Sequence, residues 1–225
     1  MLFFPTVAAL FYFLILSGSA WAKPIYIVAK TIQFGFPVLY VHLVQRQTLS
    51  VRAPHRKDWL VGFASGIALV MIIWVAYFAY YRSQPWMTQV GAHIWGKLQE
   101  IGATTLSAYL GLALLLSIVH ALLEEYYWRW FVWSELSQRW PSWLAIIMAN
   151  AAFTLHHIVV LYVYIPGTYF WTSGMLFSLG IMVGGMIWSL VYRYTGNIYS
   201  AWVSHVLVDG ALMYIGYDLT RSYWP

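Results

Sequence analysis

The chain is short of charge and has no cysteine. Only 8% of its 225 residues are charged, whereas 62% are hydrophobic; a soluble domain has roughly 25% charged residues. Without cysteine, disulfides, thiolate catalysis and cysteine-based zinc sites are excluded together. The basic residues behind the net charge of +5 are scattered over short loops, as membrane orientation requires, so nucleic acid is not an expected partner. The composition predicts a polytopic protein surrounded by the lipid bilayer.

Long apolar runs predict an all-α fold, a single transmembrane helical bundle of about seven to eight helices. The stretch between Arg82 and Gly102 fits a short interfacial helix, which would be the eighth element. The segment Ser19-Ala-Trp-Ala22 resembles a signal-peptide cleavage site, but no basic residue precedes Lys23, so a retained first helix is favoured. The expected spans are 2–22, 25–44, 59–81, 103–131, 142–164, 172–194 and 197–217.

The distribution of basic residues predicts the orientation. The loop 45–58 holds the densest basic cluster and is therefore expected on the cytoplasmic side. Its members are Arg46, Arg52, Arg56 and Lys57. Alternation of the spans adds Arg129, Arg139 and Arg193 to that side. The opposite side receives Lys23, Arg82, Lys97 and Arg221.

Few ionisable side chains fall within the apolar segments. Each costs about 2.5–3.5 kcal/mol to insert at the centre of a membrane helix, so such residues tend to mark function. The acids and histidines among them are Glu124 and Glu125 in the fourth span, His156 and His157 in the fifth, and His205 and Asp209 in the seventh. Lys30 also lies within a span. Positions four apart share a helix face, which pairs His120 with Glu124, Glu125 with Arg129, and His205 with Asp209.

Three helices can thus present polar faces to a common interior. A buried glutamate there could take a proton from water while imidazoles orient that water or stabilise an oxyanion. The same region could instead hold a divalent metal such as zinc, through Glu124, His157 and His205. Each pair also has a structural interpretation, as an ion pair or a contact between helices. The coincidence of three polar clusters in one small chain favours a functional site.

Three motifs, in order along successive helices, resemble the CPBP family of intramembrane proteases. This is the CAAX-processing and bacteriocin-processing type, also called the ABI family. The resemblance implies a motif-bearing catalytic core over 103–217, preceded by variable helices over 1–102, in the inner (plasma) membrane of a bacterium. The matching segments are Glu124-Glu125-Tyr-Tyr-Trp-Arg129 to EExxxR, Phe153-Thr-Leu-His-His157 to FxxxH, and His205-Val-Leu-Val-Asp209 to HxxxN/D.

The resemblance implies hydrolysis of a peptide bond in a membrane-anchored protein or hydrophobic peptide. Glu124 would be the general base on water, helped by His157, and His205 with Asp209 would hold the oxyanion or complete the water site. The supporting residues would be Glu125, Arg129, Phe153 and His156.

Two positions depart from the family pattern. Asp209 stands where many members have Asn, and its charge could favour a metal or a buried pair with His205. The doubled His156-His157 leaves the register open by one residue, although the four-residue step from Phe153 selects His157. A non-catalytic membrane protein of the same fold, acting in immunity or as a regulatory scaffold, is the alternative function.

Overall fold

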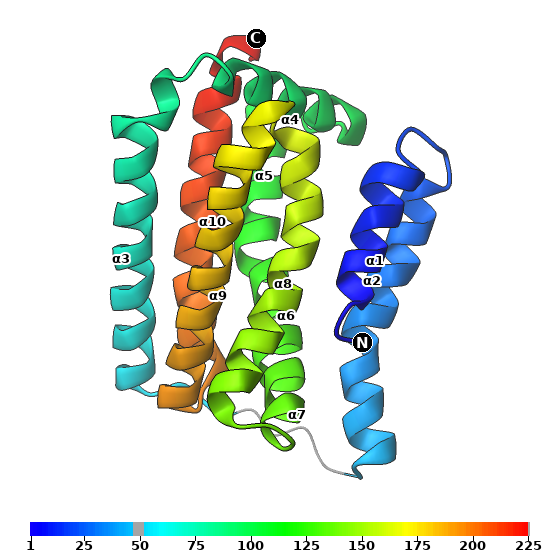
Figure 1. Ribbon diagram of the computed structural model, residues 1–225, viewed down its shortest axis with the longest axis vertical. Helices are drawn as coiled ribbons and strands as arrows, with labels where there is room; N and C mark the ends of the chain where they lie inside the picture. The colour runs from blue at the N-terminus through cyan, green and yellow to red at the C-terminus, as the bar shows by residue number, and fades with distance from the viewer. Residues whose placement is uncertain (47–51, 225) are drawn as a thin grey trace.

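The computed structural model describes residues 1–46 and 52–224, and these residues form helices joined by short turns (Figure 1). Residues 47–51 of the expected basic loop lie outside the described residues. The α-helices are α1 (Phe4–Leu10), α2 (Ala22–Leu39), α3 (Arg56–Ala79), α4 (Met87–Ile101), α5 (Leu106–Leu114), α6 (Ala121–Glu125), α7 (Ser134–Ser137), α8 (Ser142–Tyr164), α9 (Met175–Thr195) and α10 (Ile198–Thr220).

Several of these α-helices continue directly into π-helical segments, so that each forms one continuous helix. The π-helical segments are Phe11–Ile15 after α1, Tyr40–Val44 after α2, Leu115–His120 between α5 and α6, Tyr126–Trp133 between α6 and α7, and Phe170–Gly174 before α9. Short 3₁₀ turns, Tyr81–Ser83 and Arg221–Tyr223, follow α3 and α10. Glu124 and Glu125 of α6 therefore lie between two π-helical stretches. Such stretches are rare in proteins, and those that do occur are often found at functional sites.

Six continuous helices in the described part of the chain are long and apolar enough to cross a membrane, and the protein is an integral membrane protein. They are Ala22–Val44, Arg56–Ser83, Leu106–Ser137, Ser142–Tyr164, Phe170–Thr195 and Ile198–Tyr223. These correspond to the last six of the seven predicted spans. The all-helical membrane bundle predicted from the sequence is confirmed.

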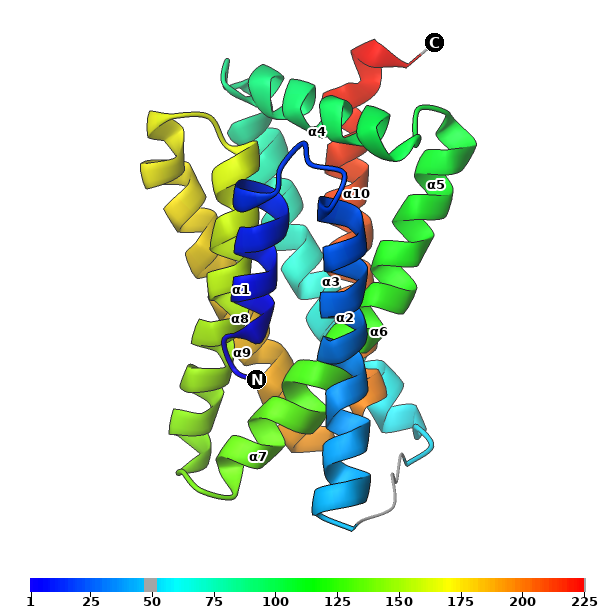
Figure 2. The ribbon, with the colours of Figure 1, turned by 90° about the vertical axis from the view of Figure 1, so that its right-hand side faces the viewer.

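The first predicted span, 2–22, differs from the prediction. The apolar helix Phe4–Ile15 rises only about 18 Å, whereas the bilayer core is about 30 Å thick. It ends before Gly18, which adopts a positive φ of 77° that favours glycine. The chain then reverses into α2, and the two helices lie side by side in front of the bundle (Figure 2). A turn, rather than a loss of hydrophobicity, shortens this segment.

The expected short helix between Arg82 and Gly102 is present as α4, which lies across one end of the bundle (Figure 1). The opposite end of the bundle carries the start of α3, the α7–α8 turn and the α9–α10 turn. Arg139 and Arg193 therefore lie at the same end of the bundle as the basic residues that precede α3, as predicted. Arg129 is an exception. It is fully buried because it is paired inside the bundle with Glu125.

Two glycines allow α3 to lie directly against α10. A Cβ atom at Gly62 would lie 2.6 Å from the backbone oxygen of Ser200, and one at Gly66 would lie 2.9 Å from Cα of Ser204. Residues four apart share one helix face, and small residues at that spacing let membrane helices approach closely. This contact fixes the part of α10 that carries His205.

Candidate active site

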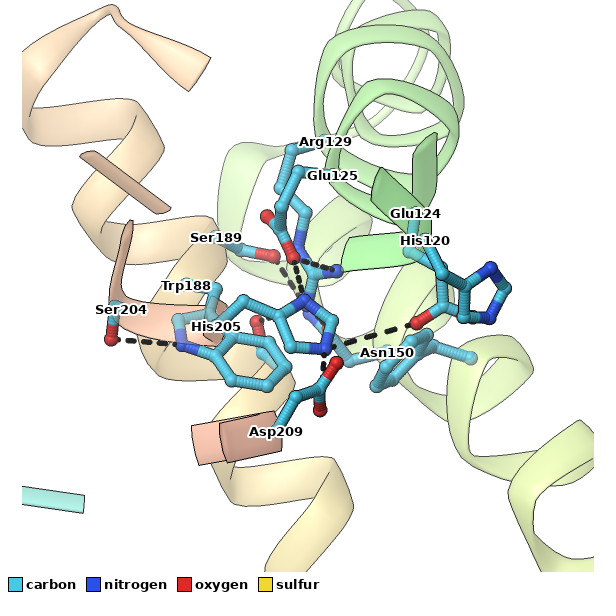
Figure 3. Close-up of polar contacts among 12 residues, drawn as sticks. His120, Glu124, Glu125, Arg129, Asn150, Trp188, Ser189, Ser204, His205 and Asp209 are labelled. Atoms are coloured by element: carbon cyan, nitrogen blue, oxygen red, sulfur yellow. Dashed lines mark hydrogen bonds and ion pairs between the residues drawn. The ribbon is translucent and has the colours of Figure 1, made fainter. Parts of the chain in front are cut away.

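Adjacent glutamates on α6 face different surroundings. Glu124 is 3% exposed and Glu125 is fully buried. Successive residues of a helix point about 100° apart, so the two carboxylates cannot share one set of partners. Figure 3 shows Glu124 beside His120, and Glu125 beside Arg129. The two sides of α6 therefore form two distinct polar clusters that meet at His205.

The Glu124 side is rich in histidine. Glu124 Oε1 lies 3.5 Å from Nε2 of His120 and 3.5 Å from Nε2 of His156, and Glu124 Oε2 lies 3.8 Å from Nε2 of His205. These separations are longer than those of ordinary hydrogen bonds. We call Glu124, His120, His156, His157 and His205 the glutamate–histidine cluster.

Two neighbouring histidines of α8 lie on the Glu124 side together. Nδ1 of His157 lies 3.0 Å from the backbone oxygen of Phe153, and because that oxygen can only accept, Nδ1 donates and Nε2 is left as the acceptor. The ring of His156 is stacked parallel to Trp128, at a centroid distance of 5.8 Å. The sequence spacing selected His157 alone, whereas both imidazoles reach Glu124.

The chemistry of this donor set fits a divalent metal ion. One ligand atom each from Glu124, His156 and His157 lies within 4.8 Å of the others, and two imidazoles with one carboxylate are the protein ligands of several hydrolytic zinc sites. The hydrogen bond from His157 Nδ1 to the backbone is the kind of outer contact that orients a metal-binding imidazole. The set predicted from the sequence contained His205 in place of His156.

The Glu125 side is closed and tightly bonded. Arg129 Nη1 donates to Glu125 Oε1 at 3.0 Å, and Arg129 Nη2 donates to the backbone oxygen of Gly185 at 3.1 Å and to Asn150 Oδ1 at 3.3 Å. Asn150 in turn donates to Ser189 Oγ at 2.9 Å. A Cβ atom on Gly185 would collide with Asn150 Oδ1. This interior ion pair ties α6, α8 and α9 together.

His205 on α10 connects the two sides. Its Nδ1 lies 2.8 Å from Glu125 Oε1, and its Nε2 lies 3.4 Å from Asp209 Oδ1. The ring stacks on Trp188 at a centroid distance of 3.9 Å, and Trp188 Nε1 donates to Ser204 Oγ at 3.0 Å. With an acceptor at each nitrogen, the ring can donate to both at once only as an imidazolium.

Access to the cluster differs from residue to residue. The side chains of His120 and Asp209 are 31% and 22% exposed, whereas that of Glu124 is 4% exposed. Glu124 is therefore closest to the surface on the side of His120 and Asp209, and we call these two side chains the opening of the site. Phe153 lies deeper, 1% exposed, where it packs against Trp128 and supports both clusters.

The structure brings the predicted site residues together on α6, α8 and α10, and it adds residues that carry no motif. Trp188, Gly185 and Ser204 position His205 and Arg129, and all three look like ordinary apolar or small residues of a membrane helix. Asn150 did have a signal, since it lies three residues before Phe153 on the same face.

Comparison with known proteins gives one match. Residues 106–211 match the family model described as Type II CAAX prenyl endopeptidase Rce1-like. This segment is Rce1-like. It begins at α5 and ends two residues after Asp209, so it contains every residue of both clusters described above. No curated protein and no solved structure matches the chain.

The Rce1-like match confirms the resemblance to CAAX-type proteases over this segment, and it supports a protease class for the chain. The buried glutamate–histidine cluster is compatible with that class. The helices before α5 lie outside the matched residues, as the sequence resemblance also had it.

Proposed function

We propose that the chain is an intramembrane endopeptidase that hydrolyses a peptide bond in a membrane-anchored protein or hydrophobic peptide. The single observation that supports this most strongly is Glu124, a carboxylate buried in the bundle with imidazole nitrogens at 3.5–3.8 Å. The Rce1-like match over residues 106–211 supports a substrate of the CAAX type, in which the cysteine four residues from the C-terminus carries a prenyl group.

In the proposed reaction Glu124 takes a proton from water, and the oxygen of that water attacks the carbonyl carbon of the peptide bond. Negative charge develops on the carbonyl oxygen. Nε2 of the His205 imidazolium, whose contact with Asp209 is long at 3.4 Å, is placed to donate to that oxygen. Glu124 then returns the proton to the leaving amine as the C–N bond breaks. His156 and His157 orient the water, since each presents an imidazole to the same carboxylate.

A divalent ion such as zinc held by Glu124, His156 and His157 would instead supply a Lewis acid that polarises the carbonyl and lowers the pKa of water. Glu124 would then serve as a ligand rather than as the free base. The contacts of His205 with Glu125 and Asp209, and the stacking on Trp188, hold its ring in the same place with or without that ion. Asp209 is best understood as the carboxylate partner of His205, at 3.4 Å.

The test is cleavage by purified protein in lipid nanodiscs of a fluorogenic peptide panel, containing farnesylated CAAX-type peptides and unmodified apolar peptides. Wild type is expected to cleave a lipid-anchored peptide, and Glu124→Gln is expected not to. Treatment with a chelator, followed by addition of zinc, tests the metal-dependent form of the proposal. Cleavage that survives Glu124→Gln contradicts the proposal.

The same variant separates the enzyme from a non-catalytic scaffold. Comparative membrane proteomics of cells carrying wild type or Glu124→Gln should reveal an uncleaved precursor in the variant. A scaffold would leave the two proteomes alike and keep its cellular phenotype in Glu124→Gln.

A further inference from the structure

Lys30 is a cation within a membrane-spanning helix, outside the Rce1-like segment. It lies in the span Ala22–Val44, eight residues from its start, or about 12 Å along the helix axis. A lysine side chain near a helix end can extend to the interface, but at this depth it cannot cover the whole distance. An unneutralised charge so placed tends to face a protein interior and to have a role there.

The surroundings of Lys30 leave its ammonium group available. Nζ lies 5.5 Å from the ring centroid of Tyr26 and 5.3 Å from that of Phe34, its helix neighbours at four residues on either side. None of the ion pairs formed by the described residues includes Lys30. Aromatic faces stabilise a cation without using its hydrogen-bond donors, so the three donors remain free for a ligand.

The same face of α2 borders the glutamate–histidine cluster. The ring of Phe34 meets the ring of His120 edge to face at 6.4 Å, and the backbone oxygen of Phe34 accepts from Tyr126 at 3.3 Å. Nζ of Lys30 lies 5.3 Å from the centroid of the same Phe34 ring, and Nε2 of His120 lies 3.5 Å from Glu124 Oε1. Lys30 is therefore within electrostatic range of the reacting carboxylate but is not one of its contacts.

The opening of the site is otherwise unfavourable to an anion. Asp209 lies at it and Glu124 lies just behind it, whereas Arg129 and His205 are buried and already bonded to Glu125. A peptide that ends in a free carboxylate near the scissile bond would be repelled by these acids. Lys30 is positioned to offset that repulsion.

We propose that Lys30 binds the C-terminal carboxylate of the peptide whose bond is cleaved at Glu124. The inference rests on the proposed endopeptidase function, and it assigns recognition of the free C-terminus to Lys30, a residue outside the Rce1-like segment. In a CAAX sequence cut after the cysteine, three residues follow that bond. Three extended residues span at most about 10 Å, so the terminal carboxylate stays close to the cleaved bond, where a cation beside the glutamate–histidine cluster can bind it.

The inference is tested by binding rather than by turnover. The probe is a fluorescein-labelled peptide with a farnesylated cysteine followed by three aliphatic residues, made as the free acid and as the C-terminal amide. Affinity for each form is measured by fluorescence anisotropy with Glu124→Gln protein in nanodiscs. We expect the acid form to bind about tenfold or more tightly than the amide, the size of one charge-assisted hydrogen bond.

Adding Lys30→Met should weaken binding of the acid form by that factor and leave the amide unchanged. Lys30→Arg should keep most of the preference. The matched control is Lys23→Met on the same helix, because Lys23 is exposed and donates to the backbone oxygen of Glu100 at the far end. This control should keep the preference for the acid form.

Equal affinity for the two forms, including no binding of the acid form, overturns the inference. So does a preference that survives Lys30→Met, or an equal loss for acid and amide, which would mean a purely structural lysine. Failure of the endopeptidase proposal looks different. Wild type would then bind the acid form through Lys30 and leave its peptide bond intact.

Discussion

Glu124 and Glu125 are neighbours in the chain, yet their surroundings differ in almost every respect. Glu125 has an arginine at 3.0 Å and an imidazole at 2.8 Å, with no solvent exposure. Glu124 has only imidazoles, at 3.5–3.8 Å, and lies beside the exposed His120. A carboxylate held by short bonds to a cation is a poor base, whereas one held loosely among imidazoles can exchange a proton with water. The difference supports the proposal that Glu124 reacts with water and that Glu125 holds the helices together.

The comparison predicts the largest effect for Glu124→Gln. The amide keeps the size of the side chain but cannot accept a proton from water, and general base catalysis contributes about 10²–10⁴-fold. We expect the rate of peptide cleavage to fall by that factor while the melting temperature changes little. Steady-state cleavage and thermal unfolding of the same preparation check both parts. Cleavage at the wild-type rate would remove Glu124 from the reaction.

Arg129→Met, unlike Glu124→Gln, should lower the stability of the protein. It leaves the charge of Glu125 buried without its partner, and breaking a buried pair in this way costs about 3–5 kcal/mol of the free energy of unfolding. We expect a marked drop in melting temperature in detergent, along with lost activity. Arg139→Met, in the exposed α7–α8 turn, is the control that should leave the melting temperature unchanged. A variant as stable as wild type would mean that Glu125 does not depend on Arg129.

Gly185→Ala tests whether the Glu125 cluster tolerates added volume. The new Cβ atom would collide with Asn150 Oδ1 and lie 3.2 Å from Arg129 Nη2, and overpacking of this kind costs about 1–3 kcal/mol. Gly184→Ala is a matched control, because nothing lies within 4 Å of its added Cβ atom. Thermal unfolding of the two variants should differ by that amount. Equal melting temperatures would show that α9 can shift without loss.

The sequence predicts the pairs within each helix well, because helical spacing alone brings residues four apart together. Glu125 with Arg129, His120 with Glu124, and His205 with Asp209 all follow from that rule. The same rule chose His157 over His156, and it could not indicate that both rings reach Glu124. That outcome depends on how α8 is rotated against α6, which is set by packing between helices.

Other parts of the site had no signal in the sequence. Gly185 matters through its backbone oxygen and its lack of a side chain, and Trp188 matters through stacking on His205. Neither property distinguishes these residues from the other glycines and tryptophans of an apolar helix. The first span was misjudged for a related reason, since hydropathy continues past Gly18 while the backbone turns there.

Asp209→Asn is expected to have the smallest effect and probes the boundary between the two clusters. The amide has the shape of the carboxylate and can still accept a hydrogen bond from His205 Nε2, while Glu125 continues to hold Nδ1 at 2.8 Å. Because the side chain is 22% exposed, solvent screening limits the loss to about 1 kcal/mol or less. Cleavage should therefore stay within about tenfold of wild type, with an almost unchanged melting temperature. A loss as large as that of Glu124→Gln would instead place Asp209 among the reacting groups. The reactive and the structural carboxylates would then be separated by His205, and not by the two sides of α6.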